Sequence, residues 1–351
     1  MSHPLQKRCG KIHFRNISPK SWEHPTDRVA LSALESIPGI DTVVRKFVGI
    51  TTEKSLRLIA LASAVRVSEQ QFPKLYNLHR EACSILDVTQ VPELYVANNP
   101  FMNAGAIGVE NPFIMLNSSM IEQLDDEEIL AVIGHELGHC LSGHALYKTL
   151  LHMLIILSMR LSSIPLSGVA IWSIILALKE WDRKSELSAD RAGLLVVQDP
   201  VVYYSLLMKM AGGTNYSEMN TNEFFQQAYE YENSNELSDS IHKMINLVNL
   251  SHPFPVLRLT ELKSWVDCGE MQKILSQQYT VRGSEDSHFE NARSAASSYY
   301  QDMEESNDPF AKIGTKASAV FDSISEETEE IQIKAGELFD SIFGNTDHHY
   351  R

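Results

Sequence analysis

Apolar and polar residues alternate at helical spacing over positions 126–143. The apolar members fall at positions i, i+3, i+4, i+8 and i+12, which are Ile129, Val132, Ile133, Leu137 and Leu141. Residues spaced in this way share one face of an α-helix, because the helix turns once every 3.6 residues. Asp125 is a preferred N-cap residue, and the acidic residues that follow it suit the positive end of the helix dipole. The pattern predicts an amphipathic helix over 126–143.

Shorter apolar segments precede this helix. Two of them, 93–97 and 112–116, have the composition of short strands, and 105–108 is a third candidate strand. Farther upstream, 56–64 and 72–86 have helical patterns. We therefore expect an α+β fold that is predominantly helical, with a small β-sheet beside the helix at 126–143.

Two apolar stretches follow the same helix. Neither 149–159 nor 161–178 contains Lys, Arg, Asp or Glu. A transmembrane helix needs about 20 consecutive apolar residues, and only the second stretch approaches that length, with Pro165 and Gly168 interrupting it. We favour an apolar helical hairpin that is buried, or that enters one leaflet, over a hairpin that spans a bilayer. Residues 149–178 are thus the candidate region for peripheral membrane contact.

The acidic charge of the chain is concentrated at one end. The 351 residues have a formal net charge of -15, and residues 283–351 contain 15 Asp and Glu against 5 Lys and Arg. This shift in composition predicts a main domain at 1–282, which includes the N-terminal helices, and an acidic helical extension at 283–351. A nucleic-acid binder is not expected, because phosphate contacts need clustered Lys and Arg.

The extension has an apolar pattern of its own. Apolar or small residues fall at alternating steps of four and three, at Ala317, Phe321, Ile324, Thr328, Ile331, Ala335, Leu338 and Ile342. One interpretation is a coiled-coil seam for self-association or for a partner protein. The other, which we favour, is an amphipathic helix packed on its own domain or a weakly ordered tail.

The candidate chemistry lies on the helix at 126–143. His135 and His139 are four residues apart, so both imidazoles lie on one helix face and can reach a single metal ion. Glu136 stands beside the first histidine, where a carboxylate can take a proton from a metal-activated water. His144 does not share the ligand face and is expected to have a supporting or structural role, and Cys140 is expected to be packed.

A zinc ion needs a third protein ligand if one position is to stay open for water or substrate. Downstream, Glu186 and Asp190 lie one helical turn apart. Glu186 could bind the metal while Asp190 accepts a hydrogen bond from a ligand histidine. The alternative is a solvated helix face, since Lys184 and Arg191 offer ordinary surface partners. From spacing alone, that alternative is favoured.

Three motifs in order, however, resemble the zinc peptidases of the HtpX and CAAX-prenyl-protease type, which are gluzincins. These motifs are the His-Glu-Leu-Gly-His of 135–139, the Arg-Lys-Ser-Glu-Leu-Ser-Ala-Asp-Arg-Ala of 183–192 and the Ser-His-Pro-Phe-Pro-Val-Leu-Arg of 251–258. The resemblance covers about 92–258, and weaker similarity to soluble-looking bacterial members extends toward the N-terminus. It implies that Glu186 is the third zinc ligand and Asp190 its supporting carboxylate. It further implies that His252 stabilises the oxyanion or gates the open position.

The resemblance also implies a function. Residues 1–282 would form a metalloendopeptidase domain that binds one Zn²⁺ per chain and cleaves polypeptide substrates with Glu136 as general base, in a role such as protein quality control. Asn103, Ala104 and Gly105 are the candidate strand edge for substrate, with a plain structural hairpin as the equal alternative. The apolar segment between the zinc motifs matches the position of two membrane crossings in HtpX-like relatives, although this chain departs from their pattern of spanning helices.

Two other functions are compatible with the sequence. The site could hold zinc without catalysis, in an interaction or chaperone-like protein, or it could act on a small amide or as an exopeptidase. The four cysteines form no Cys-x-x-Cys pair, and the polar start of the sequence is not a signal peptide. We therefore expect a protein that is not secreted and is either cytoplasmic or membrane-associated on the cytoplasmic side.

Overall fold

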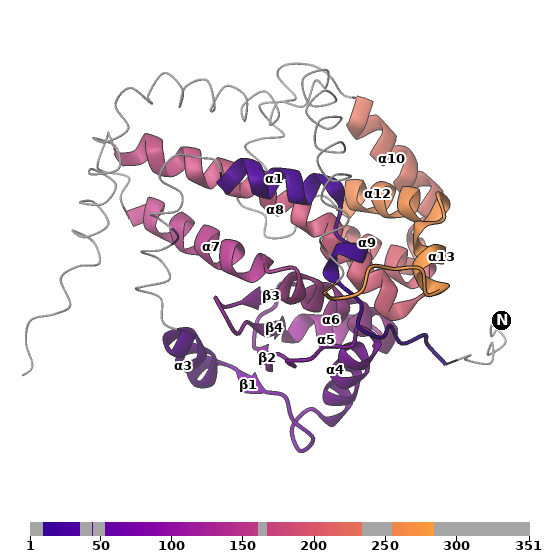
Figure 1. Cartoon of the computed structure of the whole chain (residues 1–351), viewed down its shortest axis with the longest axis horizontal. Coiled ribbons are helices and arrows are strands. Elements are labelled where there is room, and N and C mark those ends of the chain that lie inside the picture. Colours follow the sequence, from indigo (N-terminus) through magenta and orange to yellow (C-terminus); the bar gives the residue numbers. More distant parts are fainter. Residues whose placement is uncertain (1–9, 36–43, 45–52, 161–166, 234–254, 284–351) are drawn as a thin grey trace, which may run out of the picture.

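The computed structural model describes residues 10–35, 44, 53–160, 167–233 and 255–283. Within these residues, helices surround a small sheet (Figure 1). The expected α+β, predominantly helical fold is confirmed. His252 and the extension after Gly283 lie outside the described residues, and so do the self-association pattern and positions 161–166 of the hairpin.

The sheet has four strands in the order β1-β2-β4-β3. These are β1 (Val65–Arg66), β2 (Leu94–Ala97), β3 (Ala104–Ile107) and β4 (Phe113–Asn117). The β2–β4 pair is parallel, whereas β1 and β3 pair antiparallel with β2 and β4. The three strands expected from sequence are present. The two-residue β1 was not expected, because so short a segment leaves no periodic pattern. Among the described residues, β3 forms one edge of the sheet.

Helix α6 (Asp126–Leu141) is the central helix of the fold. Its N-terminus is closed by a capping box: Glu128 N donates to Asp125 Oδ1 at 2.9 Å, and Asp125 N donates to Glu128 Oε2 at 3.0 Å. The helix starts where the sequence predicts and ends two residues earlier, and Gly143 beyond it has a positive φ of 73°. Residues 128–139 are all buried, so His135, Glu136 and His139 lie inside the protein.

Helix α8 (Ser167–Val197) packs against α6 at very short range. An added β-carbon at Gly134 of α6 would lie 2.8 Å from Val196 Cβ and 3.0 Å from Gly193 Cα. Only glycine permits this approach, because any side chain would push the two backbones apart. The contact brings the carboxylates of α8 next to the histidines of α6.

The predicted apolar hairpin is formed by α7 (His144–Arg160) and the first half of α8. Described apolar residues from both arms form one buried cluster: Leu150, Leu151, Leu154, Ile175, Leu178 and Trp181. Helix α1 (Pro25–Glu35) lies along α8 and adds Ala30 and Leu31 to this cluster (Figure 1). Within the described residues, every helix is too short or too polar to cross a membrane.

Helix α9 (Pro200–Gly212) packs against α6, and α12 (Pro255–Asp267) packs against α9 and α8. Glu128 joins α6 to α9, since it accepts hydrogen bonds from Ser205 Oγ and Lys209 Nζ, both at 2.7 Å. The remaining helices are α3 (Glu53–Ser63), α4 (Pro73–Ile85), α5 (Ser118–Gln123), α10 (Thr221–Asn233) and α13 (Glu270–Leu275), with short 3₁₀ turns at Pro19–Ser21 and Tyr216–Glu218.

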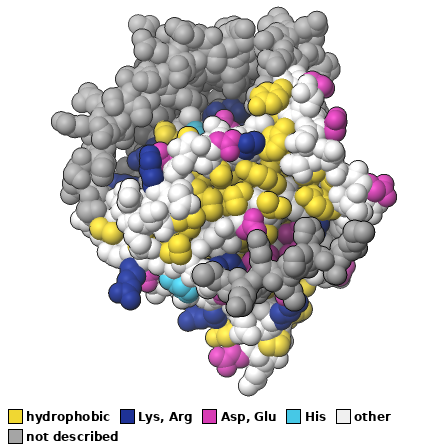
Figure 2. Space-filling model, turned by 90° about the vertical axis from the view of Figure 1, so that its right-hand side faces the viewer, with side chains coloured by type: hydrophobic (Ala, Val, Ile, Leu, Met, Phe, Trp, Pro, Cys, Tyr) yellow, Lys and Arg dark blue, Asp and Glu magenta, His cyan; other side chains and the backbone are white. Residues whose placement is uncertain are grey.

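Hydrophobic side chains also reach the surface on the side of α10, α12 and α13, where they gather near the middle of the face (Figure 2). The large exposed apolar residues of the described chain include Val201 of α9 and Tyr229 of α10. Helices α9 and α10 thus each expose part of their apolar surface.

Candidate active site

The three predicted ligands meet at one point between α6 and α8. Nε2 of His135 lies 3.4 Å from Glu186 Oε2, and Nε2 of His139 lies 3.2 Å from Glu186 Oε1. The two Nε2 atoms are 3.1 Å apart. All three side chains are buried, with exposed fractions of 5%, 0% and 0%. The sequence placed these residues on two separate helices, and the fold brings their ligand atoms together.

The donor set fits a divalent cation. A tetrahedral zinc site with zinc–ligand distances of about 2.0–2.1 Å has edges of about 3.3 Å. The two imidazole Nε2 atoms, 3.1 Å apart, lie close to that value, and one ligand atom from each of the three residues lies within 4.8 Å of the other two. Two imidazoles and one carboxylate are also a common donor set of catalytic zinc sites. Among the described residues, this is the one group of His, Cys, Asp and Glu side chains that could hold a metal ion.

Asp190 supports the first histidine. Its Oδ1 lies 3.0 Å from His135 Nδ1 and accepts a hydrogen bond from Tyr203 Oη at 2.8 Å. Burial alone would lower the pKa of His135, but Asp190 and Glu186 outweigh burial and raise that pKa to about 9. The surroundings of His135 therefore favour positive charge, as a cation site requires.

Arg258 of α12 holds both carboxylates of α8. Its Nε donates to Asp190 Oδ2 at 2.8 Å, a second nitrogen donates to Asp190 Oδ1, and a third lies 3.2 Å from Glu186 Oε2. Burial would raise the pKa of Asp190, yet Arg258 holds it below its usual value. A bidentate guanidinium therefore fixes the carboxylate that faces His135.

Lys148 of α7 approaches the site from the opposite side. Its Nζ donates to Glu186 Oε1 and to Asp182 Oδ1, both at 2.7 Å. Burial would lower the pKa of this lysine, but the two carboxylates raise it. Glu186 thus lies between two cations, Lys148 and Arg258. These side chains, and not solvent, hold its carboxylate in position.

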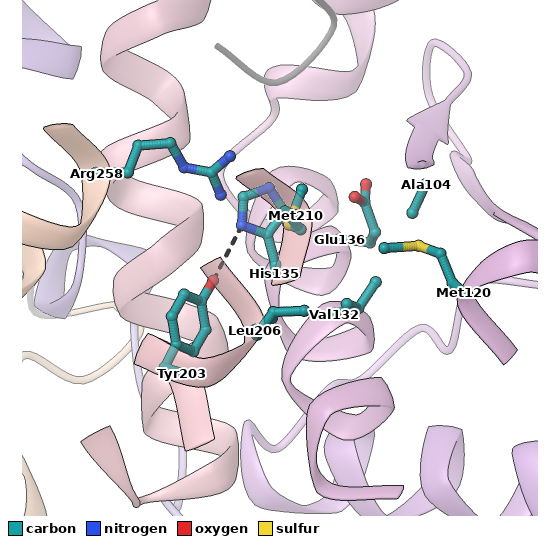
Figure 3. A pocket seen from close by; sticks show the side chains of 9 residues that line it. All are labelled: Ala104, Met120, Val132, His135, Glu136, Tyr203, Leu206, Met210 and Arg258. Carbon is teal, nitrogen blue, oxygen red and sulfur yellow. Dashed lines mark hydrogen bonds between the residues drawn. The ribbon is translucent and has the colours of Figure 1, made fainter. Parts of the chain in front are cut away.

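Glu136 lines a pocket beside the three ligand residues. Figure 3 shows its carboxylate between the His135 ring and Ala104 of β3. The rest of the lining is largely apolar and consists of Met120, Val132, Tyr203, Leu206, Met210 and Arg258. The pocket therefore combines one acidic group with an apolar wall.

The predicted substrate edge lies at this pocket in part. Ala104, the first residue of the edge strand β3, lines it, while the neighbouring Asn103, just before the strand, and Gly105, within it, are half-buried. His252 cannot be placed here, because it lies outside the described residues. The same predicted motif, at 251–258, ends with Arg258. This residue lies three positions after the first residue of α12, and the structure brings it to the site.

Several residues of the site were not found from the sequence. Lys148 and Tyr203 belong to no motif, and each reaches the site from another helix. In the sequence, the one feature that marks Lys148 is its place as a single lysine at the border of a long apolar stretch. His144, expected to play a supporting role, has its Nδ1 3.0 Å from His139 Nδ1, and Cys140 is half-buried.

Comparison with known proteins gives a family match. Residues 69–266 match Peptidase family M48. The Plastoglobule-localized metallopeptidase 48, chloroplastic, of Arabidopsis thaliana is 34% identical over 281 residues, which cover 78% of this chain and 80% of that protein. The Protease HtpX homolog of Tropheryma whipplei (strain Twist) is 27% identical over 183 residues, 44% of this chain and 62% of that protein.

The match to another Protease HtpX homolog, from Helicobacter pylori (strain J99), is more local. It is 43% identical over 68 residues, which cover 18% of this chain and 22% of that protein. Both HtpX matches therefore span less than two thirds of the bacterial proteins. No solved structure matches the chain.

Proposed function

This chain belongs to peptidase family M48, and from that premise we propose that it is a zinc-dependent endopeptidase that cleaves internal peptide bonds. The observation that carries the proposal is the convergence of His135, His139 and Glu186, whose ligand atoms all lie within 4.8 Å of one another in a buried site. In the same site, Glu136 faces a pocket that adjoins a sheet edge.

We assign His135, His139 and Glu186 as the protein ligands of one zinc ion per chain. Three protein ligands leave one position for water or substrate, as catalytic zinc sites do. When bound, zinc lowers the pKa of a water from about 15.7 toward neutrality and polarises the substrate carbonyl. Asp190 fixes the ring of His135, while Lys148 and Arg258 fix the carboxylate of Glu186.

Glu136 is the general base in this proposal. It takes a proton from the attacking water and later passes a proton to the leaving amine. Glu136 as a whole is 1% exposed, so bulk water does not compete for the proton. Glu136 directly follows His135 on α6, so one rigid helix sets the distance between the base and the metal ligands.

The substrate binds along β3. An extended peptide can add to the edge of the sheet beside Asn103, Ala104 and Gly105 through main-chain hydrogen bonds. The apolar wall of Val132, Leu206 and Met210 then receives a hydrophobic side chain of the substrate. Main-chain pairing accepts many sequences, which suits an enzyme that degrades unfolded polypeptides in quality control.

Other parts of the proposal rest on the sequence. His252 either donates to the developing oxyanion or gates the open position, and His252→Ala separates the two: turnover falls in the first case and rises in the second.

We place the enzyme on the cytoplasmic side, free or in peripheral contact with a membrane through 149–178. A relative is named as plastoglobule-localized, which supports a lipid-associated location. Fractionation of the full chain, with and without detergent, tests this assignment.

The proposed function can be tested on the purified full-length chain. Zinc content is measured by plasma mass spectrometry, and cleavage of an unfolded protein is followed by mass spectrometry of the products. We expect about one zinc per chain and internal cleavage sites. Glu136→Gln keeps the zinc and loses turnover by a factor of about 10² to 10⁴ or more.

Each rival function has its own outcome in this experiment. A wild-type chain that binds zinc but cleaves nothing supports the catalytically silent, chaperone-like alternative. Products trimmed only at their termini indicate an exopeptidase. If a pure Glu136→Gln preparation cleaves at the wild-type rate, Glu136 is not the base.

A further inference from the structure

Helix α1 lies outside residues 69–266, which match the family, yet it contributes a carboxylate to the surroundings of the metal ligands. Asp27 of α1 is 2% exposed, and its Oδ2 lies 3.0 Å from His144 Nε2. On the other side of the same ring, His144 Nδ1 lies 3.0 Å from His139 Nδ1. A continuous chain of contacts therefore runs from α1 to the second ligand histidine.

The role of His139 determines where the protons lie in this series of contacts. If Nε2 of neutral His139 offers its lone pair to a cation, the ring proton is on Nδ1 and is donated to His144 Nδ1. His144 then has its own proton on Nε2, which it donates to Asp27 Oδ2. Each ring has one donor and one acceptor in the correct place, so a single tautomer of each histidine satisfies every contact.

Other contacts hold Asp27 in place. Ser188 Oγ of α8 donates to Asp27 Oδ2 at 2.6 Å, and the backbone N–H of His24 donates to Ser188 Oγ at 2.8 Å. Ser188 is fully buried and lies two residues after Glu186 on α8. The carboxylate of α1 is therefore fixed to the same helix that carries the third ligand.

The two ligand histidines are thus supported in different ways. His135 contacts a carboxylate directly, since Asp190 lies 3.0 Å from its Nδ1. On the side away from the ligand atoms, Nδ1 of His139 contacts His144, and His144 in turn contacts the Asp27 carboxylate. Support of this kind fixes ring orientation and tautomer and commonly contributes about 10- to 100-fold to metal affinity.

We propose that Asp27 and His144 are positioning residues that fix the tautomer of His139, so that α1 is a required part of the metal site. This inference rests on the proposed function, because it takes His139 as a zinc ligand. It assigns a role in metal binding to a segment that the family match does not include.

The test measures zinc affinity of the full-length chain by competition with a chromophoric chelator. We expect Asp27→Ala and His144→Phe to weaken zinc binding about 10- to 100-fold. His144→Gln should recover part of this loss, because its amide can accept from His139 and donate to Asp27. Leu31→Ala is the matched control, because it removes packing between α1 and its neighbours but leaves the contacts of Asp27, His144 and His139 in place. It should lower thermal stability while zinc affinity stays the same.

A second readout is independent of affinity. In the zinc-loaded chain, ¹⁵N NMR of the imidazoles should show the Nδ1–H tautomer for His139 and the Nε2–H tautomer for His144. The opposite tautomer of His144 overturns the inference. So does wild-type zinc affinity in folded Asp27→Ala, or an equal loss of affinity in Leu31→Ala. A wild-type chain without zinc affinity instead overturns the proposed function, and this inference with it.

Discussion

A β-carbon added to Gly138 would lie 2.7 Å from the β-carbon of Ala192, closer than two carbon atoms can pack. It would also lie 3.1 Å from the α-carbon of Ala189. Helices α6 and α8 therefore touch at the level of their backbones, between the two ligand histidines. This contact sets how closely Glu186 can approach His139, now 3.2 Å away.

We predict that Gly138→Ala weakens zinc binding and destabilises the fold. Alanine is the better helix former by about 1 kcal/mol, but here overpacking against α8 costs about 1–3 kcal/mol and displaces Glu186. Thermal unfolding and zinc competition measure the two effects. Gly212→Ala in α9 is the control, because its added carbon meets only the flexible end of Met219. If Gly138→Ala binds zinc with wild-type affinity, the contact between α6 and α8 at Gly138 does not determine the geometry of the metal site.

A second prediction concerns the charge of Glu186. Glu186→Ala removes a ligand and also leaves Lys148 and Arg258 without their shared carboxylate. We expect zinc content to fall to background and the metal-free chain to lose about 3–5 kcal/mol of unfolding free energy, because buried cations lose a partner. Plasma mass spectrometry and urea unfolding measure the two losses. Glu122→Ala, at an exposed position of α5, should change neither. Unchanged zinc content in Glu186→Ala excludes it as a ligand.

The helix that carries the histidines could be predicted from sequence because its signals are local. Asp125, the acidic first turn and the apolar spacing act within a few residues, and the capping box of the structure uses the same groups. The small sheet was predictable for the same reason. The end of α6 was placed two residues too far, since Gly143, with φ at 73°, lies beyond the helix.

The meeting of Glu186 with the histidines could not be derived from spacing. From spacing alone, surface pairing of Glu186 with Arg191 is the favoured alternative, and only the family resemblance implies a metal ligand. In the structure, the partners of Glu186 are instead Lys148 and Arg258, which come from α7 and α12. Such partners depend on helix packing, and packing is decided by contacts between residues far apart in the chain. Asp27 and Tyr203 could not be predicted for the same reason.

A third prediction concerns stability in acid. His79 of α4 is 4% exposed, and burial, followed by the nearby Arg80, lowers its pKa to about 4, from 6.5 for the free group. Between these two values, the unfolded chain binds a proton that the folded chain does not, so stability falls as the pH drops from about 6.5 to 4. Between pH 7.5 and 5, this histidine accounts for a loss of about 2 kcal/mol.

Replacing the histidine should remove that loss. His79→Leu has no titrating group, so the metal-free variant should keep about 2 kcal/mol more of its pH 7.5 stability at pH 5 than the wild type does. Urea unfolding at both pH values measures the difference. His152→Gln, an exposed histidine of α7, is the control and should behave as the wild type does. The same acid loss in His79→Leu and the wild type would contradict the prediction.

The last prediction separates substrate binding from folding on β3. Asn117 N donates to Asn103 O at 3.0 Å, and antiparallel pairing alternates, so Gly105 bonds to Met115 while the N–H of Ala106 points away from β4. Proline has no N–H and is tolerated where an edge strand does not need one. We expect Ala106→Pro to raise the KM for a peptide about 2- to 10-fold, the equivalent of one hydrogen bond. Because Ala106 is 4% exposed and its neighbours must accommodate the ring, the melting temperature should fall, but less than when a bond of the sheet is lost. Gly105→Pro should lower the melting temperature more, because it removes a bond of the sheet itself. If Ala106→Pro leaves KM unchanged in a folded enzyme, the substrate does not pair with this edge, and the pocket of Val132 and Leu206 must select it without main-chain help.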